Sequence, residues 1–224
     1  MLSVTAMSGF GSGSAPSLPT INQTDRTIDT ASKTVYTFTS QDVGVPSANR
    51  MVLVGSNCRG GSGGAVSSVT IDGNAATEVV AADWGASASN SSLHQYALTT
   101  GTSVTIVVTY AAGKPQCGLV IWDVQNTSTT PTDTGFSVDT SDPMTDDINV
   151  LANSIVVGMA ANSSSGATHT WTGVTEEFDE TLEGTGTWTA GTAFVATADS
   201  SYTVTCDQTG TGEPAFCCAS FPPS

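Results

Sequence analysis

From residue 33 onward the sequence consists of short runs in which apolar and polar residues alternate, and this feature constrains the fold most. Examples are KTVYTFTS at 33–40, SVTIVVTY at 103–110 and SYTVTCD at 201–207. A period of two directs one side of an extended strand toward a core, and Gly, Asn, Ser or Pro residues separate the runs. No stretch of ten residues keeps a helical period. The pattern predicts an all-β fold, either a sandwich or a barrel. Of these we expect an antiparallel, jelly-roll-like β-sandwich.

The stretch VSSVTIDGNAATEVV at 66–80 shows how the runs are joined. Asp72 and Gly73 separate two alternating runs, and Asp-Gly is a strong signal for a two-residue type I′ hairpin turn. The alternative, a ligand-binding loop, lacks a second carboxylate close in sequence. We therefore expect Asp72 to reverse the chain.

Residue types support the same class and suggest the domain layout. The chain has 36 Thr and 28 Ser, and an excess of Thr suits half-buried strands. Residues 1–25 are rich in Gly, Ser and Pro and are expected to form an extended N-terminal arm, with at most one edge strand. Residues 26–224 are expected to form a single β-sandwich domain, because neither a repeat of fixed period nor a clear linker is visible.

Charge narrows the set of partners. The formal net charge is −15, with 20 acidic and five basic residues. Nucleic-acid binding is excluded because no basic stripe could neutralise phosphates, and an anionic membrane surface is disfavoured for the same reason. No apolar stretch reaches the roughly 18 residues of a membrane span. The first residues also lack the features of a secretory signal.

The five cysteines are expected to be reduced and to act as small apolar residues, because no export signal is seen. A disulfide between Cys58 and Cys117 is the alternative. The other three are Cys206, Cys217 and Cys218.

Nucleophile and acid–base patterns are weak. GGSGG at 60–64 resembles a nucleophile elbow around Ser62, but a strand-like run follows where a helix is required. His94 and His169 stand in no triad context. In EEFDETLE at 176–183, Glu177 and Asp179 are predicted to share one strand face, which would allow a glycosidase pair; a solvated acidic surface is favoured.

Two further sets of residues are candidate binding sites. Clustered loop aspartates can supply the oxygens that calcium requires, and DTSDPMTDD offers Asp139, Asp142, Asp146 and Asp147. Pro143 favours a simple turn there, so no metal or other cofactor is expected. Trp122 is expected in the core, whereas a sugar-stacking platform could use Trp84, Trp171 and Trp188.

The order of the runs resembles a family of β-sandwich structural proteins of tailed, notably marine, bacteriophages. The similarity covers about residues 30–222. It lies in TVYTFTSQDVGVPSANRMVLVG, SSVTIDGNAATEV, LHQYALTTGTSVTIVVTY and CGLVIWDVQN, and later in NSIVVGMAANSSSGATHTWTGVTEEFDE and AFCCASFPP. These are strand and turn patterns without a catalytic signature.

The resemblance implies a non-enzymatic virion protein, assembled in the host cytoplasm. The leading hypothesis is a capsid decoration or cement protein on the outside of a phage head. Its partners would be the major capsid protein or other virion proteins, and it would form a homo-oligomer, most simply a trimer. The first alternative is a receptor- or glycan-binding module of a tail or fibre that uses the tryptophans named above. The second is a glycosidase built on Glu177 and Asp179.

Overall fold

The computed structural model describes residues 17–59, 65–85, 89–138, 142–182 and 186–224. Within these residues the chain forms antiparallel strands and no helix, which confirms the predicted all-β class. The first half holds β1 (Thr20–Asp29), β2 (Lys33–Asp42), β3 (Arg50–Cys58), β4 (Val66–Ile71), β5 (Asn74–Ala75), β6 (Thr77–Asp83), β7 (Asn90–Ala97), β8 (Ser103–Lys114) and β9 (Cys117–Gln125). The second half holds β10 (Asp133–Ser137), β11 (Met144–Val150), β12 (Ser154–Asn162), β13 (His169–Thr172), β14 (Thr175–Leu182), β15 (Gly186–Val195), β16 (Asp199–Gln208) and β17 (Ala215–Phe221).

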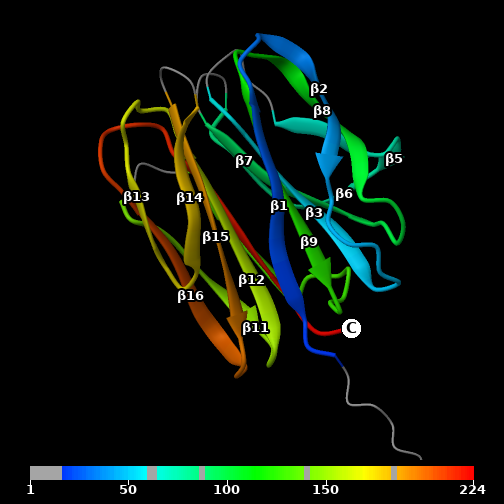
Figure 1. Cartoon of the computed structure of the whole chain (residues 1–224). Coiled ribbons are helices and arrows are strands. Elements are labelled where there is room, and N and C mark those ends of the chain that lie inside the picture. The colour runs from blue at the N-terminus through cyan, green and yellow to red at the C-terminus, as the bar shows by residue number, and fades with distance from the viewer. Residues whose placement is uncertain (1–16, 60–64, 86–88, 139–141, 183–185) are drawn as a thin grey trace, which may run out of the picture.

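The strands form four sheets that stack as four layers (Figure 1). Inner sheet I has the order β1-β9-β3-β7-β6 and faces inner sheet II, β10-β17-β12-β15-β14. Outer sheet I, β2-β8-β4-β5, covers the other side of inner sheet I. Outer sheet II, β11-β16-β13, covers the other side of inner sheet II. In Figure 1 the layers run from outer sheet I on the right to outer sheet II on the left.

The two halves of the chain share one topology. In roll I, formed by β1 to β9, the orders β1-β9-β3-β7 and β2-β8-β4-β5 are those of a jelly roll, and β6 is an added edge strand. In roll II the equivalent orders are β10-β17-β12-β15 and β11-β16-β13, with β14 as the added strand. The sequence predicts one sandwich and no repeat. The structure instead stacks two jelly rolls of the same strand order.

One apolar core joins the rolls. The central core lies between the inner sheets and takes Leu53 and Trp122 from roll I and Met159 and Trp188 from roll II, all essentially inaccessible. Each roll also has a core of its own between its inner and outer sheets. The prediction that Trp122 is a core residue is confirmed. Because both inner sheets are covered on both faces, the rolls pack as one unit.

The edge strands indicate an approximate two-fold relation between the rolls. Arg26 of β1 pairs with Glu180 of β14 at 2.5 Å and lies 4.4 Å from the centre of the Phe178 ring. At the opposite edges β6 packs against β10. Since β1 is equivalent to β10, and β6 to β14, exchanging the rolls maps one contact onto the other. The chain is therefore built like a dimer within a single polypeptide.

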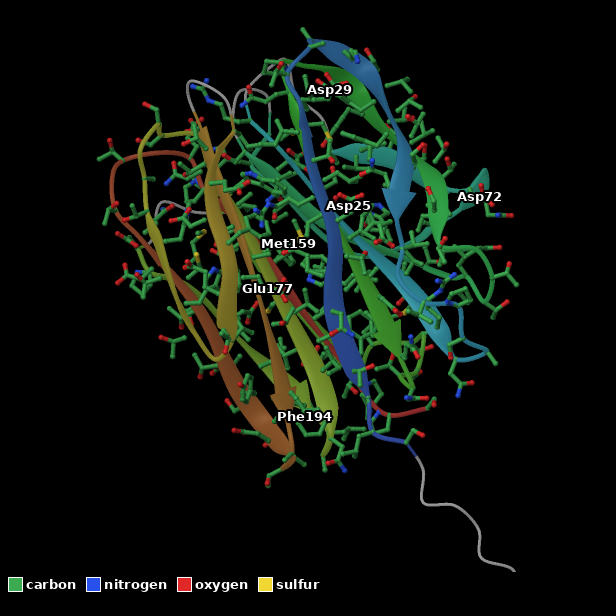
Figure 2. All side chains as sticks on the ribbon, viewed as in Figure 1. Asp25, Asp29, Asp72, Met159, Glu177 and Phe194 are labelled. Atoms are coloured by element: carbon green, nitrogen blue, oxygen red, sulfur yellow. The ribbon has the colours of Figure 1, made fainter. Side chains whose placement is uncertain are left out.

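The Asp72–Gly73 turn is confirmed. Asp72 has φ +51° and Gly73 has φ +78°, the positive values that a type I′ turn requires. Ile71 pairs with Asn74 across the turn, and Figure 2 shows Asp72 at the rim of roll I, far from Met159.

Other boundaries differ from the expectations. The arm was expected to end at residue 25, but β1 begins at Thr20 and pairs with β9 along its length. Strand β11 occupies much of the region read as an acidic turn. Strands β1 and β11 carry Asp, Asn or Thr at most positions, so local apolar alternation is weak. Their pairing partners make them strands.

Candidate functional site

The solvent side of outer sheet I carries no ionisable side chain along its middle. On β2, Tyr36 and Phe38 point into the core of roll I, so the alternating residues Val35, Thr37 and Thr39 point outward and are exposed. The neutral face, as we call it, also contains five residues of β4 and β8. They are Ser68, Thr70, Thr105, Val107 and Thr109.

Strand register arranges the neutral face in rows. Thr109 of β8 lies between Val35 of β2 and Ser68 of β4. Val107 lies between Thr37 and Thr70 in the next row. Hydroxyl and methyl groups therefore alternate over three neighbouring strands. The alternation was visible in the sequence, but only strand pairing shows that the three runs form one surface.

The equivalent surface of roll II is charged. On outer sheet II, Asp147 and Asp207 point to solvent, and Asp147 accepts hydrogen bonds from Thr203 at 2.6 Å and Ser201 at 3.2 Å. In a chain of charge −15, an uncharged face is where another acidic surface can approach with the least repulsion. The neutral face is therefore the candidate docking site.

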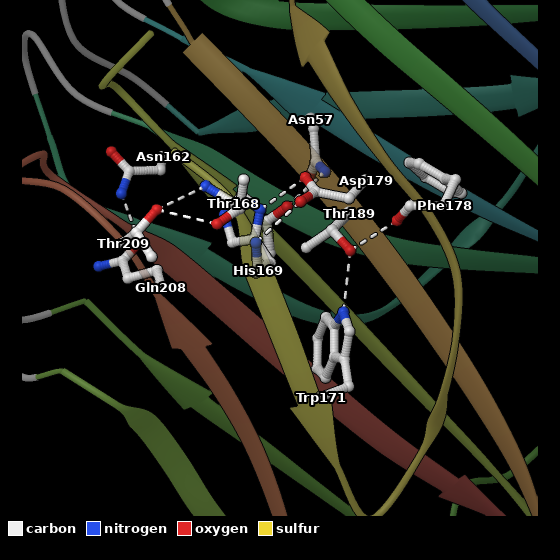
Figure 3. A network of polar contacts seen from close by, with 11 residues as sticks. Asn57, Asn162, Thr168, His169, Trp171, Phe178, Asp179, Thr189, Gln208 and Thr209 are labelled. Atoms are coloured by element: carbon white, nitrogen blue, oxygen red, sulfur yellow. Dashed lines mark hydrogen bonds and ion pairs between the residues drawn. The ribbon is translucent and has the colours of Figure 1, made fainter. Parts of the chain in front are cut away.

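A polar network braces the end of roll II (Figure 3). His169 Nδ1 lies 2.8 Å from Asp179 Oδ1, and the backbone N–H of His169 donates to Asp179 Oδ2 at 2.8 Å. Nearby, Trp171 Nε1 donates to Thr189 Oγ1 at 2.8 Å, and that hydroxyl donates to the Phe178 carbonyl at 2.6 Å. The imidazole of His169 is fully buried. A buried ring cannot meet a substrate, so this geometry ties β13 to β14.

Glu177 and Asp179 do not share a strand face, and this part of the glycosidase hypothesis is wrong. A β-bulge interrupts the pairing of β14 with β15 between Glu176 and Phe178, and an added residue reverses the alternation beyond it. Glu177 therefore turns to inner sheet I, where it accepts from Trp122 Nε1 at 2.7 Å. Asp179 turns to His169 on the other side. The two carboxylates cannot act on one bond.

The four aspartates considered as a weak calcium candidate are not assembled into a site by the residues that the structure describes. Asp139 lies outside them. Asp142 accepts from the Gln208 backbone N–H at 3.0 Å, Asp146 from Phe136 N–H at 2.9 Å, and Asp147 from hydroxyls of outer sheet II. Among the described residues no three His, Cys, Asp or Glu side chains lie close enough to hold a metal ion.

The tryptophans that the glycan-binding alternative would use do not form an exposed platform, because two of the three are buried. Trp188 is fully buried in the central core, and Trp171 is 9% exposed in the core of roll II. Both sit on strands between packed sheets, so their ring faces are covered by protein. Trp84 alone of the three remains partly exposed.

All five cysteines are free and buried. Burial raises the pKa of Cys58 to about 12 and that of Cys117 to about 11, so both thiols are protonated near neutral pH and are poor nucleophiles. Ser62 lies outside the described residues.

His94 is expected to make stability depend on pH. Its side chain is 3% exposed, and burial lowers its pKa to about 4. Glu78, at 3.8 Å, is half exposed and is therefore too weak an ion-pair partner to offset this effect. The unfolded state, with a pKa near 6.5, binds more protons between about pH 4 and 6.5, so stability falls as pH drops through that range. From about pH 7.5 to about pH 5 the expected loss is about 2 kcal/mol.

Urea denaturation of the wild type and of His94→Gln at several pH values tests this. Gln does not titrate, so the variant is expected to lose about 2 kcal/mol less than the wild type over the same interval. Equal pH dependence of the two proteins would contradict the assignment.

One hollow, of about 400 Å³, adjoins the end of β7 and the connection between the rolls. Its lining includes Thr77, Gln95, Tyr96, Thr129 and Thr130 and has no carboxylate, imidazole, thiol or amine. It therefore presents no charged group, and Tyr96 stands there without a second acid or base as a partner.

Comparison with known proteins gives no family. No protein-family model matches the chain, and no curated protein is significantly similar to it. No helix in the described part of the chain is long and apolar enough to span a membrane.

Proposed function

We propose that this chain is a structural protein of a virus particle, and most specifically a decoration protein bound to the outer surface of a phage head. The observation that carries the proposal is the stack of two jelly rolls of equal strand order around one core. Jelly rolls recur in viral capsid proteins. The step from this fold to a role is an analogy, because one fold hosts many functions.

The mechanism follows from the outer surfaces of the two rolls. Roll I would dock on the capsid through the neutral face, whose hydroxyl and methyl groups supply hydrogen bonds and apolar contact without unpaired charge. Roll II would then turn its acidic outer sheet, with Asp147 and Asp207, to the solvent. The partner would be the major capsid protein or another virion protein. Self-association, with a trimer as the simplest arrangement, belongs to the same proposal and can be measured by light scattering.

Binding to particles tests the proposal. Purified protein is incubated with particles of the virus that encodes this chain, stripped of their own copies, and located by gold-labelled antibodies. Thr37→Asp places a charge in the neutral face, and Thr172→Asp places one on the exposed side of outer sheet II, opposite the neutral Thr205. We expect label over the head and at least about tenfold weaker binding of Thr37→Asp, because a buried unpaired charge is costly.

Thr172→Asp is the matched control and is expected to bind like the wild type. Label confined to the tail, or absent from particles altogether, would reject the head assignment. Equal weakening by both substitutions would reject the neutral face as the docking site while leaving the particle location standing.

A further inference from the structure

Two cysteines stand opposite each other on neighbouring strands of roll I. Strands β3 and β9 pair antiparallel, and the last pair of their ladder is Asn57 with Gly118. One step further along the same register places Cys58 against Cys117. Both side chains point into the core between inner sheet I and outer sheet I, so they lie on the same face.

The two thiols also share a polar neighbour. The hydroxyl of Tyr110, from outer sheet I, lies 3.5 Å from Cys117 Sγ and hydrogen-bonds the Cys58 thiol as well. Ser56 Oγ lies 2.7 Å from that hydroxyl and 3.7 Å from Cys117 Sγ. The two sulfur atoms therefore converge on one small polar cluster.

The backbone geometry suits a bond between them. Directly opposed residues of an antiparallel pair have Cα atoms about 4.5 or 5.5 Å apart, within the range of about 4.4–6.8 Å found for disulfides. Their Cβ atoms need to approach by about 1 Å at most. Cys58 is the last residue of β3 and Cys117 the first of β9, so this adjustment falls at strand ends, where local opening is easiest.

The other cysteines have no such partner. Cys217 points into the central core, and its neighbour Cys218 points into the core of roll II. Cys206 reaches the core of roll II from the opposite sheet. Cys58 and Cys117 are thus the pair that strand register brings together.

We propose that Cys58 and Cys117 are a modification site that closes into a cross-strand disulfide when the chain meets a two-electron oxidant. Both S–H bonds break and one S–S bond forms. The two protons and two electrons pass to the oxidant; with an azodicarboxamide they convert its N=N bond to a hydrazine. In the reducing host cytoplasm the pair would stay open, and outside the cell it would close. The chemistry does not depend on the role proposed above.

The experiment uses the full-length reduced chain and the azodicarboxamide diamide. After treatment the protein is unfolded, remaining thiols are alkylated, and peptides are identified by mass spectrometry without reduction. We expect alkylated thiols to fall from five to three, a linked peptide pair containing Cys58 and Cys117, and a higher melting temperature that a dithiol reductant reverses. In Cys117→Ser no linked peptide is expected, and the melting temperature should not respond to the oxidant.

Two results would overturn the proposal. One is retention of all five thiols after prolonged oxidation, both in buffer and in urea well below the unfolding midpoint. The other is a linked peptide that joins Cys58 or Cys117 to any of the remaining cysteines. Neither result bears on particle binding, so failure here is distinguishable from failure of the decoration role.

Discussion

Replacing Arg50 by Met is expected to lower the free energy of unfolding by about 3–5 kcal/mol. Arg50 is 1% exposed, and its guanidinium donates to five backbone carbonyls from two loops. The acceptors are Leu98 at 2.6 Å, Thr100 at 2.6 Å, Gly101 at 2.8 Å, Gly44 at 3.1 Å and Val43 at 3.2 Å. The five donors of one planar group are matched by five acceptors.

The physical reason for the large effect is that Met fills much of the volume but donates nothing. Several carbonyls that are buried or partly buried would then lose their partner, and each such loss costs about 1–3 kcal/mol. Part of this is recovered where water can enter. Burial lowers the pKa of Arg50, and the charge of Asp123 acts in the opposite direction. Lysine is a poor substitute, because it has three donors on a compact head.

Thermal and urea unfolding of Arg50→Met, Arg50→Lys and Lys33→Met measure this. A loss of the expected size lowers the melting temperature by on the order of 10 °C for a chain of this length. Lys33→Met is the matched control. The Lys33 side chain is 43% exposed and its ammonium pairs with Asp29, so its removal is expected to cost less than about 1 kcal/mol. An Arg50→Met protein as stable as Lys33→Met would show that the carbonyl clamp contributes little.

The second large effect is expected where the rolls meet. Met159 of β12 inserts where Gly55 of β3 has no side chain. A Cβ at Gly55 would overlap the Met159 sulfur and lie 2.7 Å from Val120 Cγ1. Met159→Ala is expected to cost about 2–5 kcal/mol through the cavity it leaves, and Gly55→Ala about 1–3 kcal/mol through overpacking.

The double variant separates local fit from general destabilisation. In Gly55→Ala with Met159→Ala the new methyl group occupies part of the vacated space, so the total loss is expected to fall below the sum of the single losses by about 1 kcal/mol or more. Gly55→Ala combined with Met144→Ala, a change in the core of roll II, should be additive. Additivity in both pairs, measured by urea unfolding, would contradict the proposed contact.

Much of the local structure could be predicted from the sequence. Alternation of apolar and polar residues predicts strands such as β2 and β8. Their apolar residues lie on one face of the strand, and any fold that buries this face must keep the segment extended. The turn at Asp72 and Gly73 follows from the positive φ values it needs. Local signals of this kind depend only on neighbouring residues.

The candidate functional residues could not be placed correctly from the sequence, because each candidate site depended on a contact between distant parts of the chain. Glu177 and Asp179 were expected on one face, and a bulge that forms only against β15 separates them. Trp171 and Trp188 have the same residue type as a sugar platform but lie between sheets. The neutral face needed the register of three strands before its eight residues formed a surface.

By itself the sequence determined that the chain is all-β, where many of its strands and turns lie, and that its surface is acidic, since these properties depend on residue type and on spacing of a few residues. Tertiary structure alone decided that the strands form two jelly rolls of similar strand order, that Arg50 donates to five carbonyls, and that Cys58 opposes Cys117. Each of these features depends on the pairing of strands that are distant in sequence. In the ladder of β1 and β9, for example, Ile28 pairs with Gly118. Such pairings are set by how whole sheets bury their faces against one another, which no short stretch encodes.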